Sequence, residues 1–168
     1  MTVKEIAQKD PQSLTGRAYT FAEQAHAGQM RKSGEPYFNH ALATAETLRH
    51  WHTDETTIAA GLLHDVVEDT AVTEENLKKE FGDEIAFLVD GVTKLSRIKY
   101  SGAEAKVENL RKMILAISQD LRVVFIKLAA VIFVVLVGSF YISPENWTPF
   151  APYGMSGLSF FGYHIAGQ

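Results

Sequence analysis

The chain has 168 residues, of which 46% are hydrophobic and 21% are charged, as expected for one globular domain with a sizeable core. Its net charge of -4 argues against nucleic acid as the main partner. It contains no cysteine, which excludes disulfides, thiolate zinc sites and cysteine nucleophiles.

The N-terminal residues 1–11 are polar and mixed in charge, without the apolar stretch of a signal peptide, so we expect a cytoplasmic protein. Ser13 is a good N-cap, and Gly28 supplies a stop for the helix that follows. Between them, apolar residues repeat at helical spacing and predict an amphipathic helix: Leu14, Ala18, Phe21, Ala22 and Ala25. His26 can be a ligand, but a histidine placed favourably at a helix C-terminus is the preferred interpretation.

Residues 29–40 are predicted to form a loop, because Gly34 and Pro36 interrupt any regular element. The loop places two cations and a hydroxyl beside two aromatic rings: Arg31, Lys32, Ser33, Tyr37 and Phe38. This combination can bind a phosphorylated, base-bearing ligand, with charge for the phosphate and flat faces for the base. A solvated basic turn explains the same residues equally well.

A second helix is predicted to begin at Asn39 or His40, and a third to run over residues 54–67. The turn between them is short, so the two helices should pack antiparallel. Antiparallel packing could bring His40 close to His64 and Asp65.

The segment 61–70, which includes the end of the third predicted helix, has a helical pattern and carries a histidine and three carboxylates within six positions: His64, Asp65, Glu68 and Asp69. Residues four apart share a helix face, and the apolar neighbours Leu62, Leu63, Val66 and Val67 hold the other side in a core. Imidazole nitrogen and carboxylate oxygen suit a divalent metal, and the nearby acids can orient or deprotonate a water. The alternative is a helix end with solvated acids.

Further helices are predicted over residues 73–81, 85–95 and 104–118. No segment shows the alternation of a strand. The sequence therefore predicts an all-α fold for the first 128 residues.

Four motifs, in order along the chain, resemble the HD hydrolase domain of the RelA/SpoT family: QMRKSGEPYFNH (29–40), AGLLHDVVEDT (60–70), GVTKL (91–95) and ENLRKM (108–113). The resemblance covers roughly residues 13–129. It implies an α-helical HD-domain bundle that uses Mn²⁺ to remove the 3′-pyrophosphate from (p)ppGpp, guanosine tetra- or pentaphosphate, in the stringent response.

The resemblance also implies roles for individual residues. His40, His64 and Asp65 would be metal ligands. The carboxylates of Glu68 and Asp69 would position or activate the attacking water. The guanosine nucleotide would be contacted from the loop by Arg31, Lys32 and Ser33.

The family pattern ends abruptly after Ala129. Ala130 stands where the family has an aspartate that completes the metal site, and Val134 stands where it has an asparagine that helps to hold the nucleotide. We therefore expect hydrolysis to be impaired. The alternatives are a catalytically inactive guanosine-nucleotide-binding module or a chimeric fragment.

Residues 1–129 are accordingly predicted to form the HD-type domain, and residues 130–168 to form an apolar C-terminal helix and an irregular tail foreign to it. Residues 143–157 resemble the loop after a membrane helix in amino-acid permeases. Residues 128–142 are uncharged but fall short of the ~20 residues that a membrane span needs. We expect them to contact a membrane or a partner; a buried final helix is the alternative.

Overall fold

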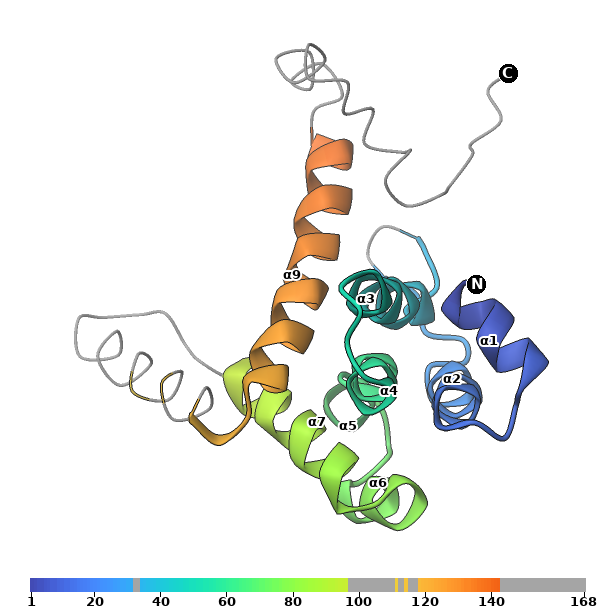
Figure 1. Cartoon of the computed structure of the whole chain (residues 1–168). Helices are drawn as coiled ribbons and strands as arrows, with labels where there is room; N and C mark the ends of the chain where they lie inside the picture. The colour runs from blue at the N-terminus through green and yellow to red at the C-terminus, as the bar shows by residue number, and fades with distance from the viewer. Residues whose placement is uncertain (32–33, 97–110, 112–113, 115–117, 143–168) are drawn as a thin grey trace. The chain divides into compact units, whose positions relative to one another are not determined.

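The computed structural model describes residues 1–31, 34–96, 111, 114 and 118–142, with the backbone alone for residues 135–142. Every regular element among these residues is a helix, apart from one isolated bridge between Met30 and Pro36. The predicted all-α fold is thus confirmed for the described residues (Figure 1).

The chain begins with a helix that the sequence analysis did not predict, α1 (Val3–Lys9). Thr2 and Glu5 form a capping box, in which each side chain accepts a hydrogen bond from the other residue's backbone N–H. Val3 is buried, and its backbone N–H donates to Glu46 Oε1 at 2.6 Å. The polar composition of this segment concealed its helix, although the Thr-x-x-Glu spacing is a helix-start signal.

The predicted first amphipathic helix is present as α2 (Leu14–Ala25). The Ser13 side chain accepts a hydrogen bond from Gly16 N–H at the start of the helix, as expected for an N-cap. Ala18 and Ala22 of its apolar stripe are fully buried. The helix ends at His26, its C-cap residue.

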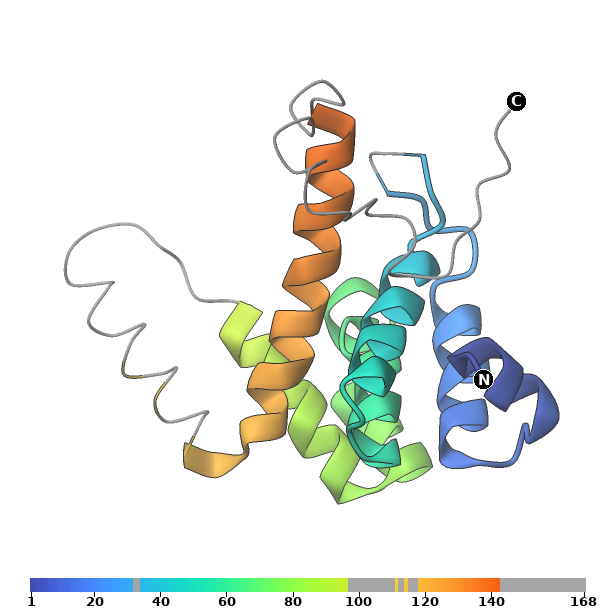
Figure 2. The ribbon, with the colours of Figure 1, turned by 45° about the horizontal axis from the view of Figure 1, so that its top comes forward.

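The predicted antiparallel pair consists of α3 (Phe38–His50) and α4 (Glu55–Leu63), which lie side by side in both views (Figure 1, Figure 2). Asp54 caps α4 by accepting a hydrogen bond from Thr57 N–H at 2.9 Å. At Gly61 an added Cβ would lie 2.4 Å from Leu48 Cδ1, the end of a flexible side chain, and 3.7 Å from Ala45 Cα. Glycine at this position therefore leaves room for the Leu48 side chain between the two helices.

The structure corrects the predicted extent of the third helix. α4 ends at Leu63, His64 is its C-cap, and a separate turn, α5 (Val66–Asp69), follows Asp65. The His64 ring donates from Nδ1 to the carbonyl oxygen of Gly61 at 2.8 Å. The side chain thus satisfies a carbonyl at the end of the helix, where backbone partners run out.

The next two helices agree with the sequence analysis. Thr73 begins α6 (Glu74–Phe81) with a capping box, and Gly82, at φ +87°, separates it from α7 (Asp83–Ser96). The core that these helices share with α2, α3 and α4 is almost wholly aliphatic; among its fully buried side chains are Leu48, Leu62, Leu63, Leu77, Ile85, Leu88 and Ile126. The predicted helix over residues 104–118 falls mostly outside the described residues.

The last described helix is α9 (Leu121–Ile142), which begins before the apolar segment that the sequence analysis marked at residue 128. The chain divides into two compact units, Met1–Phe133 and Val134–Gln168. In the described part of the chain, no helix combines the length and apolar character that crossing a membrane requires. The permease-like residues 143–157 lie outside the described residues.

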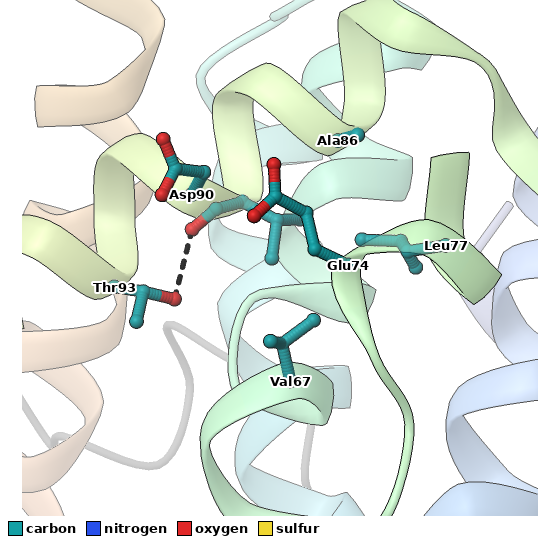
Figure 3. Close-up of a pocket in the computed structure, with 7 residues that line it drawn as sticks. Val67, Glu74, Leu77, Ala86, Asp90 and Thr93 are labelled. Atoms are coloured by element: carbon teal, nitrogen blue, oxygen red, sulfur yellow. Dashed lines mark hydrogen bonds between the residues drawn. The ribbon is translucent and has the colours of Figure 1, made fainter.

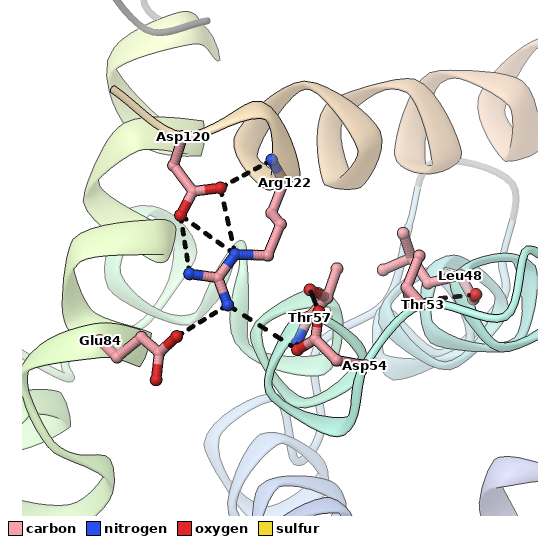
Figure 4. Close-up of polar contacts among 7 residues, drawn as sticks. All are labelled: Leu48, Thr53, Asp54, Thr57, Glu84, Asp120 and Arg122. Carbon is pink, nitrogen blue, oxygen red and sulfur yellow. Dashed lines mark hydrogen bonds and ion pairs between the residues drawn. The ribbon is translucent and has the colours of Figure 1, made fainter. Parts of the chain in front are cut away.

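Arg122 fixes the start of α9 within the first unit. Its guanidinium pairs with Asp120 and with Glu84, each at 2.7 Å, and lies 3.8 Å from Asp54 (Figure 4). The hydrogen bonds from Arg122 hold the pKa of the Asp120 carboxyl below its ordinary value. One cation thereby joins the N-terminal ends of α4, α7 and α9.

We predict that Arg122→Ala lowers the free energy of unfolding by about 1–2 kcal/mol, because it removes charge-assisted hydrogen bonds to Asp120, whose side chain is 18% exposed, and to the exposed Glu84. Urea unfolding followed by circular dichroism measures this change. Lys78→Ala is the control, since the Lys78–Asp83 pair is largely exposed and its loss should leave the free energy of unfolding almost unchanged. Equal losses in the two variants would contradict the role assigned to Arg122.

Candidate metal centre

Two imidazoles and one carboxylate converge where α3 meets the turn between α4 and α5. One ligand atom from each of His40, His64 and Asp65 can be chosen so that all three lie within 4.8 Å of one another. His64 Nε2 is 3.1 Å from Asp65 Oδ1, and His40 Nε2 is 3.5 Å from Asp65 Oδ2. The structure thus brings together the three residues that the sequence analysis proposed as metal ligands.

The local backbone aims the His64 ring. His64 is 1% exposed, and its Nδ1–H donates to Gly61 O, which leaves Nε2 on the side of Asp65. Metal-binding histidines are commonly oriented in this way, through a bond from the second ring nitrogen to a carbonyl. The turn that ends α4 therefore also orients His64.

His40 lies in the first turn of α3 and is 4% exposed. Burial lowers the pKa of its imidazole to about 3, and the neighbouring charge of His64 adds to the shift. Its Nδ1 is buried and has no hydrogen-bond partner in the described part of the chain. At neutral pH His40 is a neutral base, the protonation state that a metal ligand needs.

Asp65 remains ionised at the centre of the cluster. Burial acts to raise the pKa of its carboxyl, but the charge and hydrogen bond of His64, together with the charge of His40, outweigh burial and hold the pKa at about 2. Nitrogen and oxygen donors of this kind suit several divalent cations, including Zn²⁺ and Mn²⁺. The residues present fit a divalent ion, and three protein donors leave half of the six positions of an octahedral ion to water or substrate.

One side of α9 lines the same centre. The Phe133 ring lies 5.3 Å from the His40 ring, and the charge of Lys127 lowers the pKa of both His40 and Asp65. Lys127 Nζ donates to Ser96 Oγ at 2.7 Å. Ala130 is three residues from each of these α9 residues, so it shares their side of the helix, and it is 4% exposed. The position where the family pattern has an aspartate therefore faces the centre and offers only a methyl group.

The two further acids, Glu68 and Asp69, lie on α5, one turn beyond Asp65, and both are exposed. The Tyr37 hydroxyl donates to Asp69 Oδ2 and lies 3.4 Å from Asp65 Oδ2. Burial, followed by the bond to Asp69, raises the pKa of Tyr37, so its hydroxyl stays protonated. Asp69 is thus tied to the edge of the centre.

The predicted basic loop is a tight hairpin. Arg31 N–H donates to Glu35 O at 2.8 Å, and Tyr37 N–H donates to Gln29 O at 2.9 Å. The Arg31 guanidinium lies over the Tyr37 ring, 5.6 Å from its centroid, and its charge lowers the pKa of His40. Arg31 therefore reaches the centre, whereas Lys32 and Ser33 lie outside the described residues.

The structure also shows how the two aromatic residues of the loop are used. His26 stacks on the Tyr37 ring at 4.9 Å, and its Nδ1 pairs with Gln29 Oε1 at 2.8 Å. Phe38 is buried and packs edge-on against Tyr19. Both rings already pack against protein side chains, which argues against the suggested role of free flat faces for a base. His26 supports the loop and does not join the metal-ligand cluster.

A separate hollow lies between α5, α6 and α7 (Figure 3). Its lining is mixed, with aliphatic side chains beside Thr93 and the two carboxylates Glu74 and Asp90. At about 100 Å³ it is smaller than the ~300–1,000 Å³ of typical ligand pockets, and none of the predicted site residues lines it. It is not a nucleotide site.

Comparison with known proteins agrees with this geometry. A family model described as "HD domain" matches residues 18–133. A solved structure, described as a metazoan ortholog of SpoT that hydrolyzes ppGpp and plays a role in starvation responses, superposes with a TM-score of 0.57 at 31% identity. The match covers 71% of this chain and 67% of that one.

Longer relatives resemble the same region. A guanosine-3′,5′-bis(diphosphate) 3′-pyrophosphohydrolase of Haemophilus influenzae is 55% identical over 109 residues, which cover 64% of this chain and 16% of the relative. A GTP pyrophosphokinase of Myxococcus xanthus is 47% identical over 132 residues, 76% of this chain and 17% of the relative. The chain thus matches about a sixth of the length of these relatives.

We predict that Mn²⁺ at 100 times its Kd raises the free energy of unfolding by about 2.7 kcal/mol, because the ion binds only the folded protein. Urea unfolding with Mn²⁺ or with EDTA measures the difference. Asp65→Asn, nearly isosteric but a poor ligand, should abolish it. Asp90→Asn, at a carboxylate paired with Lys94 on α7, should retain it. An Asp65→Asn protein stabilised as much as the wild type would contradict this assignment.

Proposed function

This chain belongs to the HD-domain family, and on that premise we propose that it acts on (p)ppGpp as a Mn²⁺-dependent 3′-pyrophosphohydrolase whose metal centre lacks one carboxylate. The observation that carries the proposal is the convergence of His40, His64 and Asp65 within 4.8 Å. The names of the pyrophosphohydrolase relatives and of the SpoT ortholog support the choice of substrate.

In this proposal, His40, His64 and Asp65 hold the ion. A divalent ion held by these residues would supply a water of lowered pKa and would neutralise phosphate charge. Asp69, which Tyr37 holds beside Asp65, or the exposed Glu68 accepts a proton from the attacking water. Arg31, together with Lys32 and Ser33 of the same loop, binds the phosphates and the nucleoside.

The reaction consumes one water for each pyrophosphate released. The water oxygen forms a bond to the phosphorus attached at the 3′ position, and the bond from that phosphorus to the 3′-oxygen breaks. The 3′-oxygen leaves with a proton, so ppGpp yields GDP and pyrophosphate, and pppGpp yields GTP and pyrophosphate. The acids of α5 need only move a proton, which matches their place at the edge of the centre.

We further propose that turnover is slow because of Ala130. It faces the centre without an oxygen, so the ion would lack a protein ligand that the family pattern supplies. Even the hydrogen-bond partners of metal ligands are worth about 10–100-fold in affinity or activity, and a direct ligand should matter at least as much.

A second candidate function rests on the same residue. Because Ala130 replaces a metal ligand but the loop still carries Arg31, the chain can be a guanosine-nucleotide-binding module without turnover. Three further points stay predictions: that the chain is a chimeric fragment, that it is located in the cytoplasm, and that its residues 128–142 contact a membrane or a partner.

We predict measurable but slow release of pyrophosphate from ppGpp in the presence of Mn²⁺, abolished in His64→Ala and accelerated at least tenfold by Ala130→Asp. A coupled pyrophosphate assay measures the rates. The double variant Ala130→Asp/Asp65→Asn is the control, because the new carboxylate should not work without Asp65.

Two results distinguish the alternatives. Equilibrium binding of ppGpp without turnover in the wild type, with turnover in Ala130→Asp, would favour the binding module. No turnover in either folded protein, together with no binding of ppGpp, would contradict the proposed function.

A further inference from the structure

The Tyr37 side chain contacts three parts of the site: the metal-ligand cluster, the acids of α5 and the basic loop. Tyr37 is the residue immediately before α3, and its side chain caps no backbone group of that helix. Its hydroxyl reaches the carboxylates of Asp65 and Asp69, while its ring meets His26 and Arg31. The sequence motifs place Tyr37 in the basic loop, and the proposed function uses only its contact with Asp69.

The Tyr37 ring packs edge-on against the ligand His40, with ring centroids 6.4 Å apart, but its closest aromatic partner is not a metal ligand. His26 stacks on it at an interplanar angle of 20°, and His26 is itself fixed by its bond to Gln29. Gln29 Nε2 in turn donates to the backbone oxygen of Asp69 at 2.8 Å. The ring is therefore anchored to the end of α2 and to the backbone of α5.

The Tyr37 hydroxyl lies between two carboxylates that have different roles in the proposed function. Asp65 is a metal ligand, and Asp69 is a proton acceptor. Asp65 uses Oδ1 towards His64, and its Oδ2 lies between His40 Nε2 at 3.5 Å and the Tyr37 hydroxyl at 3.4 Å. A phenol has one proton, which the two carboxylate oxygens share, with Asp69 Oδ2 as the nearer acceptor. The same oxygen thus orients Asp69 and limits how far the Asp65 carboxylate can rotate about its last bond.

We propose that Tyr37 is a positioning residue of the metal centre, whose hydroxyl fixes Asp65 in the ligand orientation and holds Asp69 beside it. This inference rests on the proposed function, because it assumes that His40, His64 and Asp65 bind a divalent ion. Tyr37 does not touch the ion or the reacting phosphate. Its effect is exerted through the two carboxylates.

The test is the Mn²⁺ affinity of Tyr37→Phe, which removes one oxygen atom and keeps the stacked ring. Titration followed by the electron paramagnetic resonance signal of free Mn²⁺ gives Kd without any need for turnover. We expect the Kd to rise about tenfold, the lower end of the range for partners that orient metal ligands. Circular dichroism measures the folded fraction of each protein, and each Kd is calculated for the folded protein alone.

Tyr19→Phe is the matched control. Tyr19 also pairs its hydroxyl with a carboxylate, Glu23, and packs edge-on against Phe38, but it contacts no metal ligand. A Kd for Tyr37→Phe equal to that of Tyr19→Phe would overturn the inference and leave the proposed function intact. A wild-type protein that binds no Mn²⁺ would overturn both.

A second measurement uses the wild-type protein, so it does not depend on how the variant folds. With tyrosine labelled at ¹³Cζ, the Tyr37 resonance should shift when diamagnetic Mg²⁺ is added, because its hydroxyl partner Asp65 changes environment. The Tyr19 resonance should not shift. A Tyr37 resonance that does not respond to saturating Mg²⁺ would overturn the inference.

Discussion

The close packing of α3 against α4 is the constraint on which the rest of the site depends. His40 comes from one helix and His64 from the end of the other, so their separation follows from the distance between the two helix axes. Gly61 leaves room for the Leu48 side chain between these helices, and its carbonyl also orients His64. One residue without a side chain thus serves both the fold and the metal centre.

Burial determines the chemistry of the cluster. A charged imidazole is unfavourable at the position of His40, whereas Asp65 stays ionised because histidines surround it. A neutral nitrogen donor beside a fixed anion is a natural site for a cation. The ion pairs of Arg122 with Asp120 and Glu84 support the metal centre from a distance, because they fix the start of α9. This helix brings Lys127, Ala130 and Phe133 to the metal centre.

Much of this arrangement could be predicted from the sequence, because it follows from local patterns. Helical spacing of apolar residues located α2, α6 and α7, and the short turn at residues 51–54 predicted the antiparallel pair that unites His40 with Asp65. The break after Leu63 was missed, since the bond from His64 to Gly61 depends on a rotamer that spacing does not reveal. The roles of Tyr37 and Phe133 depend on contacts between distant segments, which no local pattern encodes.

The most direct measurement is electron spin echo envelope modulation of Mn²⁺ bound to the wild-type protein, with ¹⁵N-histidine labelling. This method counts the histidine nitrogens coordinated to the ion. The geometry of His40 and His64 predicts two, with one lost in each of the single variants His40→Gln and His64→Gln. A spectrum with no coordinated histidine nitrogen would contradict the assignment of this cluster as a metal centre.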